Sequence, residues 1–185
     1  MALVKIEKPE FDVELYIAYA TEDNFTGAAM YKNAHCYAHE VTAKHLQKAI
    51  KLAAAVGLRF KIFDAFRPIE VQKMLWDKYS DPSFISNPET GPCPHCRGVA
   101  LDLTLIDMEG NELDMGTGFD AFSDLSHHGV IEGISAEALR NRHIFAGIMA
   151  TAGFDQHPNE WWHYQLPNFT IYDKLTDAEA GTNML

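Results

Sequence analysis

The sequence has few cysteines, few basic residues and no long hydrophobic run, and each shortage excludes a class of protein. Its three cysteines, Cys36, Cys93 and Cys96, are too few and odd in number for a framework of disulfides. The 15 lysine and arginine residues are outnumbered by 26 aspartate and glutamate residues, which gives a formal net charge of −11. Surfaces that bind nucleic acid or anionic lipid need surplus basic side chains, so neither partner is expected.

No stretch approaches the roughly 20 apolar residues that a membrane-spanning helix needs. The start of the chain, MALVKIEKPEFD, has no apolar signal core. We therefore expect a cytoplasmic protein, or a periplasmic one if an export signal was removed. With 47% hydrophobic and 22% charged residues, and no repeat or linker, residues 1–185 are expected to form a single domain.

Hydrophobic periodicity predicts a mixture of strands and helices. Strands are expected at residues 13–20, 58–62, 99–105 and 161–166, and helices at residues 41–56, 68–79 and 135–152. Pro68 and Ser135 are suited to begin two of the helices, and Gly57 and Gly153 to end two. The order lacks the regular strand–helix alternation of a doubly wound fold. The expected class is therefore α+β, with a mostly antiparallel sheet flanked by helices.

The longest irregular segment covers residues 80–98, SDPSFISNPETGPCPHCRG, and long loops in compact domains usually carry function. Its Cys93 and Cys96 have a spacing that can bind zinc or form a redox pair. A structural zinc site usually needs a second cysteine pair, and a redox pair usually lies between a strand and a helix. Ordinary thiols are therefore the favoured interpretation of these two cysteines.

Asp102 lies in the middle of the strand predicted at residues 99–105, on the face opposite its leucines. A carboxylate among apolar residues needs a cation or several hydrogen-bond donors. An arginine is the ordinary partner of a lone aspartate. The alternative is a metal ion, because His95 precedes Asp102 by seven residues.

Glu160 begins the segment EWWH at residues 160–163, which places a carboxylate three residues before His163. Catalytic zinc sites use three protein ligands and leave one position for water, and a nearby glutamate can take a proton from that water. Residues three apart on a regular strand point to opposite faces, so Glu160 is expected on a bend before the strand. The alternative is a tryptophan-rich core with an incidental histidine.

Arg67, in the segment DAFRP at residues 64–68, follows a predicted strand and precedes a predicted helix. Its planar guanidinium could reach a carboxylate or a developing oxyanion in a cleft. The alternative is a surface ion pair with Asp64, which would contribute little to stability.

These segments together resemble the D-alanyl-D-alanine dipeptidases, zinc enzymes that split the dipeptide D-Ala-D-Ala. The family motif S-x-H-x-x-G-x-A-x-D is similar to CPHCRGVALD at residues 93–102, and the family's D-L-T-L run follows. The E-W-W-H and arginine motifs are the segments described above. Further matches are DNFTG at 23–27, DMGTGFD at 114–120, SHH at 126–128 and NR at 141–142. The resemblance extends over residues 19–164.

The resemblance implies the small α+β fold shared by these peptidases, the lysostaphin-type enzymes and the hedgehog signalling domain. It implies one zinc ion per chain, held by His95, Asp102 and His163. It also implies hydrolysis of the small dipeptide D-Ala-D-Ala to two D-alanines.

The remaining roles are implied by the same motif positions. A water activated by zinc and Glu160 would attack the peptide bond, and Arg67 would stabilise the tetrahedral intermediate. Asp120 and Tyr19 correspond to positions that hold the amino end of the substrate. Cys93 takes the place of the first serine of the motif at a substrate-binding position, and a thiol is a weaker hydrogen-bond partner than a hydroxyl.

Three other functions compete with this one. A peptidoglycan D,D-carboxypeptidase on the same scaffold would trim longer peptides and should lack an acidic clamp for the amino end, so Asp120 favours the dipeptidase. A non-catalytic domain that holds zinc only to bind a partner could lose Glu160, which is present. A metal or redox protein built on Cys93 and Cys96 would depend on both thiols.

Overall fold

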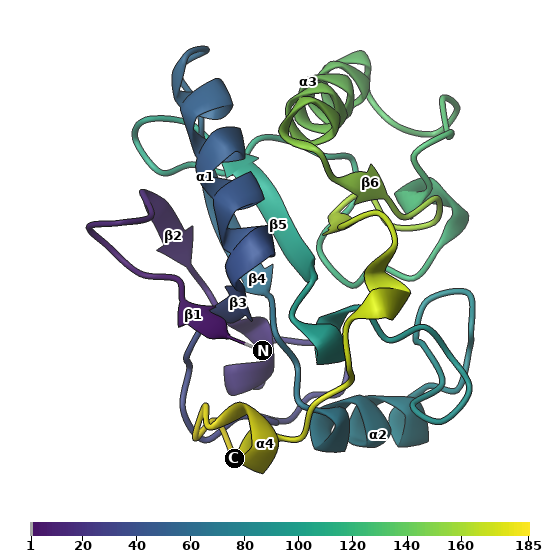
Figure 1. Cartoon of the computed structure of the whole chain (residues 1–185). Helices are drawn as coiled ribbons and strands as arrows, with labels where there is room; N and C mark the ends of the chain where they lie inside the picture. Colours follow the sequence, from purple (N-terminus) through teal and green to yellow (C-terminus); the bar gives the residue numbers. More distant parts are fainter. Residues whose placement is uncertain (1) are drawn as a thin grey trace.

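The computed structural model describes residues 2–185, and a five-stranded sheet runs through its centre (Figure 1). In spatial order its strands are β2 (Val13–Leu15), β4 (Arg59–Asp64), β5 (Ala100–Ile106), β7 (His163–Gln165) and β6 (Asp155–Gln156). Neighbouring strands are antiparallel except for β2 and β4, which are parallel. The predicted α+β class and mostly antiparallel sheet are confirmed.

The long helices α1 and α3 pack side by side, and the core lies between them and the sheet (Figure 1). The remaining elements lie around these two layers, the helix pair and the sheet. The helices are α1 (Glu40–Ala54), α2 (Ile69–Lys78), α3 (Ala136–Ala152) and the short α4 (Asp177–Ala180), and β1 (Leu3–Lys5) pairs with β3 (Tyr37–His39) in a second sheet. No helix within residues 2–185 has the length and hydropathy needed to span a bilayer.

Helix boundaries follow the local chemistry that the sequence indicated. Pro68 is the N-cap of α2, where its missing backbone N–H is not needed. The Ser135 side chain accepts a hydrogen bond from the backbone N–H of Ala138 and so caps α3. Gly153 ends α3 with a φ of 106°, a left-handed conformation that glycine adopts without steric cost. These helices therefore end within a residue or two of the predicted positions.

The central strand β5 is buried along its whole length. Leu101, Leu103 and Leu105 belong to the hydrophobic core, as their alternation predicts. Asp102 and Thr104 point the other way, yet they are buried as well. Burial on both faces explains why a carboxylate in this strand needs strong local partners.

Two predicted strands are shorter than expected. The strand predicted at residues 13–20 ends at Leu15, and Ala18–Ala20 form a 3₁₀ turn closed by a hydrogen bond from Thr21 N–H to the Ala18 carbonyl. The strand predicted at residues 161–166 is reduced to His163–Gln165, because the tryptophans before it form a turn. Both turns place side chains in the site described next.

Candidate metal and active site

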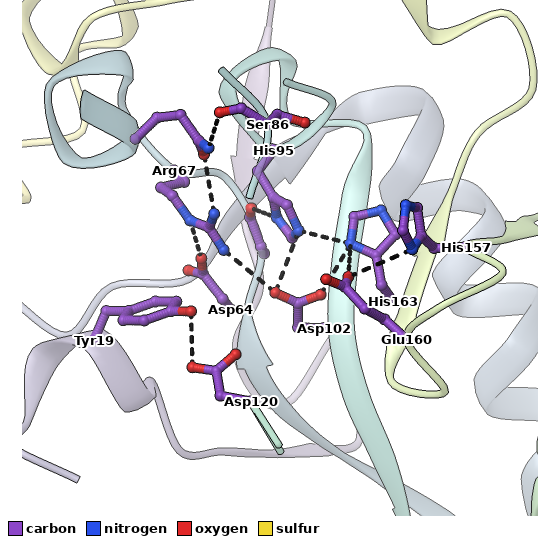
Figure 2. A network of polar contacts seen from close by, with 12 residues as sticks. Tyr19, Asp64, Arg67, Ser86, His95, Asp102, Asp120, His157, Glu160 and His163 are labelled. Atoms are coloured by element: carbon purple, nitrogen blue, oxygen red, sulfur yellow. Dashed lines mark hydrogen bonds and ion pairs between the residues drawn. The ribbon is translucent and has the colours of Figure 1, made fainter. Parts of the chain in front are cut away.

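The three predicted ligands meet in space. Their ligand atoms all lie within 4.8 Å of one another, and the three side chains are buried. His95 Nε2 lies 3.1 Å from His163 Nδ1 and 3.2 Å from an Asp102 carboxylate oxygen, and His163 Nδ1 lies 3.1 Å from the other oxygen (Figure 2). No other such cluster of histidine, cysteine and acidic residues occurs within residues 2–185.

Strand register explains much of this convergence. Asp102 on β5 is the direct partner of His163 on β7. On its other side β5 pairs with β4, where an irregularity after Ile62 brings Asp64 opposite Asp102. Such bulges redirect side chains locally. Asp64, Asp102 and His163 therefore occupy one level of three adjacent strands.

His95 reaches this level from the loop, through a short 3₁₀ turn, His95–Arg97. Gly98 then turns the chain into β5 with a φ of 68°. A Cβ atom at Gly98 would lie 2.7 Å from Leu3 Cδ2 and 3.0 Å from the His39 backbone nitrogen. Glycine is needed here for both conformation and space.

The hydrogen bonds of the two imidazoles show that the site suits a metal ion. His95 Nδ1 lies 2.7 Å from the Ala65 carbonyl oxygen, which can only accept, so Nδ1 carries the proton. His163 Nε2 lies 3.0 Å from Oε1 of Gln165 and donates to it in the same way. When the two rings are neutral, the nitrogens that face the site, His95 Nε2 and His163 Nδ1, each hold a lone pair. Two lone pairs and the Asp102 carboxylate converge, and this donor set fits a zinc ion.

The electrostatics of Asp102 and His163 are those of buried groups with opposing neighbours. Burial opposes ionisation of Asp102, but His95 and His163 outweigh burial and hold the pKa of its carboxyl well below the ordinary value. Burial lowers the pKa of His163, against the pull of Asp102. A cation bound here takes the place of the imidazole protons that stabilise the ionised Asp102, because metal ligands bind in their deprotonated forms.

Glu160 lies beside the three predicted ligands, on the bend that its spacing predicted. One carboxylate oxygen is 3.7 Å from His163 Nδ1, and the side chain is buried. Burial raises the pKa of Glu160 well above its ordinary value, and the charges of Asp102 and Asp120 raise it further. A carboxyl with a raised pKa readily takes up a proton, as a general base must.

Arg67 is held in place by three hydrogen bonds and one aromatic contact. Its Nε donates to Asp64 at 2.8 Å, Nη1 to Gln72 at 3.0 Å and Nη2 to Asp102 at 3.4 Å, and the guanidinium lies 5.0 Å from the Tyr19 ring centroid. The alternative of an ion pair with Asp64 at the surface is wrong only in its location: the pair forms, but both side chains are buried. A guanidinium has five N–H groups, so two remain for a ligand.

Tyr19 and Asp120, the two residues expected to hold the amino end of a substrate, are in direct contact. The Tyr19 hydroxyl donates to Asp120 Oδ2 at 2.9 Å. Burial raises the pKa of Asp120 to about 8, with a further contribution from the charge of Asp102. Cys93 lies nearby with a φ of 44°, and its thiol donates to the Asn87 carbonyl at 3.2 Å. These side chains, the ligands, Glu160 and Arg67 all line one cavity of about 100 Å³.

The two loop cysteines stand outside the metal cluster. Both are free thiols, and neither belongs to the group of His95, Asp102 and His163. A hydrogen bond from Cys96 lowers the pKa of Cys93 to about 7.

Four polar residues of this cavity were not identified from the sequence: Gln72, Ser86, His157 and Gln165. Gln165 follows His163 by two residues, so strand alternation could have placed it on the same face. His157 precedes Glu160 by three residues, the same separation as between Glu160 and His163. Burial, together with the neighbouring His163, lowers the pKa of His157 to about 3, so its ring is neutral at neutral pH. Gln72 carries no comparable sequence signal, because only the start of α2 brings it to Arg67.

Two strands and the turns beside them gather two histidines, an aspartate, a glutamate and an arginine around a small cavity, which is the arrangement expected of a metal-dependent hydrolase. The chain belongs to the D-alanyl-D-alanine dipeptidase family, because the family described as D-ala-D-ala dipeptidase matches residues 1–180. This confirms the resemblance seen in the sequence and places the chain among the metallopeptidases.

Individual relatives carry the same description. The chain is 41% identical over 166 residues to the D-alanyl-D-alanine dipeptidase of Escherichia coli, which covers 90% of this chain and 85% of that protein. It is 33% identical over 168 residues to the enzyme of Enterococcus faecium, with coverages of 80% and 83%. Among solved structures it is similar to a mutant of the vancomycin resistance D,D-pentapeptidase VanY in complex with Zn(II), with a TM-score of 0.49, 15% identity and coverages of 78% and 84%.

Proposed function

We propose that the chain hydrolyses the dipeptide D-Ala-D-Ala to two D-alanines, with one zinc ion held by His95, Asp102 and His163. The observation that carries the metal assignment is the convergence of two imidazole lone pairs on a buried carboxylate. Family membership supplies the substrate class. When bound, zinc supplies a Lewis acid that polarises the peptide carbonyl and lowers the pKa of water.

The protein's own side chains supply the proton transfer and part of the charge stabilisation. Glu160 takes a proton from the attacking water and delivers it to the leaving amine, and its raised pKa suits both steps. The two N–H groups of Arg67 that have no protein partner stabilise the developing oxyanion. One such donor typically contributes about 3–4 kcal/mol to the transition state.

The amino end of the substrate pairs with Asp120 in this proposal, and Tyr19 holds the acceptor in place through its hydroxyl. A buried carboxylate beside a small cavity suits an ammonium group of the substrate. Each charge then compensates the other for the water that it loses on burial. Cys93 lines the same cavity and is proposed to contact the substrate.

The whole chain is proposed to act as a single domain, since its buried apolar residues form a continuous core from Ile6 to Met184. A cytoplasmic location remains a prediction from the sequence. So does the expectation that neither nucleic acid nor membrane is a partner.

The decisive experiment measures alanine released from D-Ala-D-Ala, L-Ala-L-Ala and a tripeptide ending in D-Ala-D-Ala, with and without a chelator. We expect release from D-Ala-D-Ala alone, loss with the chelator and recovery with added zinc. Release from the tripeptide at a comparable rate would instead indicate a D,D-carboxypeptidase. Activity that survives complete removal of metal would refute the proposed zinc site.

A further inference from the structure

His157 lines the active-site cavity but has no role in the mechanism above. Its Nδ1 atom is buried and has no hydrogen-bond partner. That atom lies 3.9 Å from Oε2 of Glu160, and the His157 ring packs edge-on against His163 at 5.4 Å between centroids. Figure 2 shows His157 and His163 on the same side of the Glu160 carboxylate. Buried polar atoms without a partner are uncommon, so this one calls for an explanation.

A tight turn fixes the two side chains relative to each other. Residues 157–160 read HPNE, and proline followed by asparagine suits the two central positions of a β-turn. The Glu160 N–H points to the His157 carbonyl at 3.5 Å, and the His157 N–H donates to the His163 carbonyl at 3.1 Å. The Asn159 side chain donates to the Ser83 carbonyl at 3.1 Å, which ties the turn to the long loop. The relative position of His157 and Glu160 is therefore determined by the backbone.

The chemistry of the two groups decides which ring nitrogen carries the proton. A neutral imidazole has one N–H, and its other nitrogen is an acceptor. An ionised carboxylate only accepts, so a lone pair on Nδ1 would face the lone pairs of Glu160 and repel them. A proton on Nδ1 removes that repulsion. The Nδ1–H form is therefore the one that this geometry favours.

We propose that His157 is a positioning residue for the general base: its Nδ1–H donates to Oε2 of Glu160 and orients the carboxylate toward the attacking water. The inference rests on the proposed function. The observed 3.9 Å separation must shorten by about 1 Å to make this hydrogen bond, and catalytic hydrogen bonds often tighten only when substrate is bound. Because a misplacement of about 1 Å can cost on the order of 100-fold in rate, losing this contact should reduce kcat rather than substrate binding.

Three substitutions of His157 separate this role from a structural one. In His157→Asn the side-chain amide nitrogen occupies the place of Nδ1, whereas in His157→Gln it occupies the place of Nε2. His157→Leu keeps bulk and removes both nitrogens. We expect Leu and Gln to lower kcat about 10- to 100-fold with KM changed less than about three-fold, and Asn to recover most of kcat. His143→Asn, at an exposed position on α3, is the matched control and should match the wild type.

The outcomes that overturn the proposal are distinct. Equal recovery by Asn and Gln, or full activity of His157→Leu, would show that no donor at the Nδ1 position is needed. Loss of bound zinc in His157→Leu would make His157 a ligand instead. A wild-type protein that releases no alanine would refute the proposed function itself, whereas the next measurement tests the Nδ1–H contact of His157 without turnover.

Nitrogen-15 NMR of the histidine rings reports the tautomer directly, with and without zinc. His157→Asn removes one set of ring signals and so assigns it. We expect those signals to show the proton on Nδ1 in the wild type at neutral pH. A proton on Nε2 would overturn the proposal whether or not the enzyme turns over.

Discussion

The Tyr19 hydroxyl donates to Oδ2 of Asp120 across 2.9 Å, which joins residues 101 positions apart at one wall of the cavity. Tyr19 is in a 3₁₀ turn and Asp120 has a φ of 56°, so neither reaches this place by extending a regular strand. The contact fixes one carboxylate oxygen and leaves the other available to a ligand. It therefore marks where the amino end of the substrate is expected.

Asp120→Asn should raise KM for D-Ala-D-Ala at least ten-fold with a smaller change in kcat, because the ammonium group loses its charged partner. Selectivity for a free amino end should fall as well. Steady-state kinetics on D-Ala-D-Ala and on its N-acetylated form measures both effects. Unchanged KM on both substrates would remove Asp120 from the binding site.

The same substitution should stabilise the metal-free protein at alkaline pH. Burial raises the pKa of Asp120 to about 8, so the folded protein keeps a proton that the unfolded chain loses near pH 4. The unfolded state then binds fewer protons, and stability falls as pH rises between about 4 and 8. Asn cannot ionise, so Asp120→Asn should gain in free energy of unfolding relative to the wild type across this range. Urea titrations of both proteins at several pH values in the presence of a chelator test this. A difference in free energy of unfolding between variant and wild type that does not grow with pH would contradict it.

Glu160→Gln should keep one zinc per chain and lower kcat by about 100- to 10,000-fold, because the amide cannot accept a proton. Atomic absorption measures the zinc content, and turnover of D-Ala-D-Ala measures the loss of kcat, so the two expectations are checked separately. Glu137→Gln, at an exposed site on α3, serves as the control. Retained turnover would exclude Glu160 as the base, and lost zinc would make it a ligand.

Arg67→Lys should lower kcat by about 100- to 1,000-fold even though it keeps the positive charge, because an ammonium cannot reproduce three planar contacts and still donate to an oxyanion. Arg67→Ala should also destabilise the fold by about 3–5 kcal/mol, since it leaves Asp64 buried without its partner. Thermal unfolding and kinetics of both variants separate the two effects. A lysine variant with wild-type kcat would exclude Arg67 from oxyanion stabilisation.

Replacing both Cys93 and Cys96 by serine should leave zinc content unchanged, because neither thiol belongs to the metal cluster. Serine is the better hydrogen-bond partner at position 93, so kcat/KM should equal or exceed that of the wild type. Loss of zinc in the double variant would instead support the cysteine-based metal site.

Local patterns in the sequence were enough to predict much of the scaffold. Ser135 and Gly153 delimit α3, and Pro68 begins α2, because capping depends on only a few neighbouring residues. Period-2 alternation predicted that Asp102 faces away from the leucine core. The three-residue separation of Glu160 and His163 predicted the bend before β7. The motif match then predicted that His95, Asp102 and His163 share one site, and the structure brings these three side chains together.

Other properties depend on contacts between distant segments, and no local pattern encodes these. The irregularity in β4 that sets Asp64 opposite Asp102, and the burial of Arg67 between Asp64 and Gln72, arise only when strands and helices pack. The unpartnered nitrogen of His157 is likewise visible only in the folded chain. Amino-acid type and short-range spacing thus decide which groups are available and how each segment begins and ends. Packing decides which groups share a site, how deeply each is buried and which protons they hold, because desolvation and hydrogen bonding act over a few ångströms in space regardless of separation along the chain.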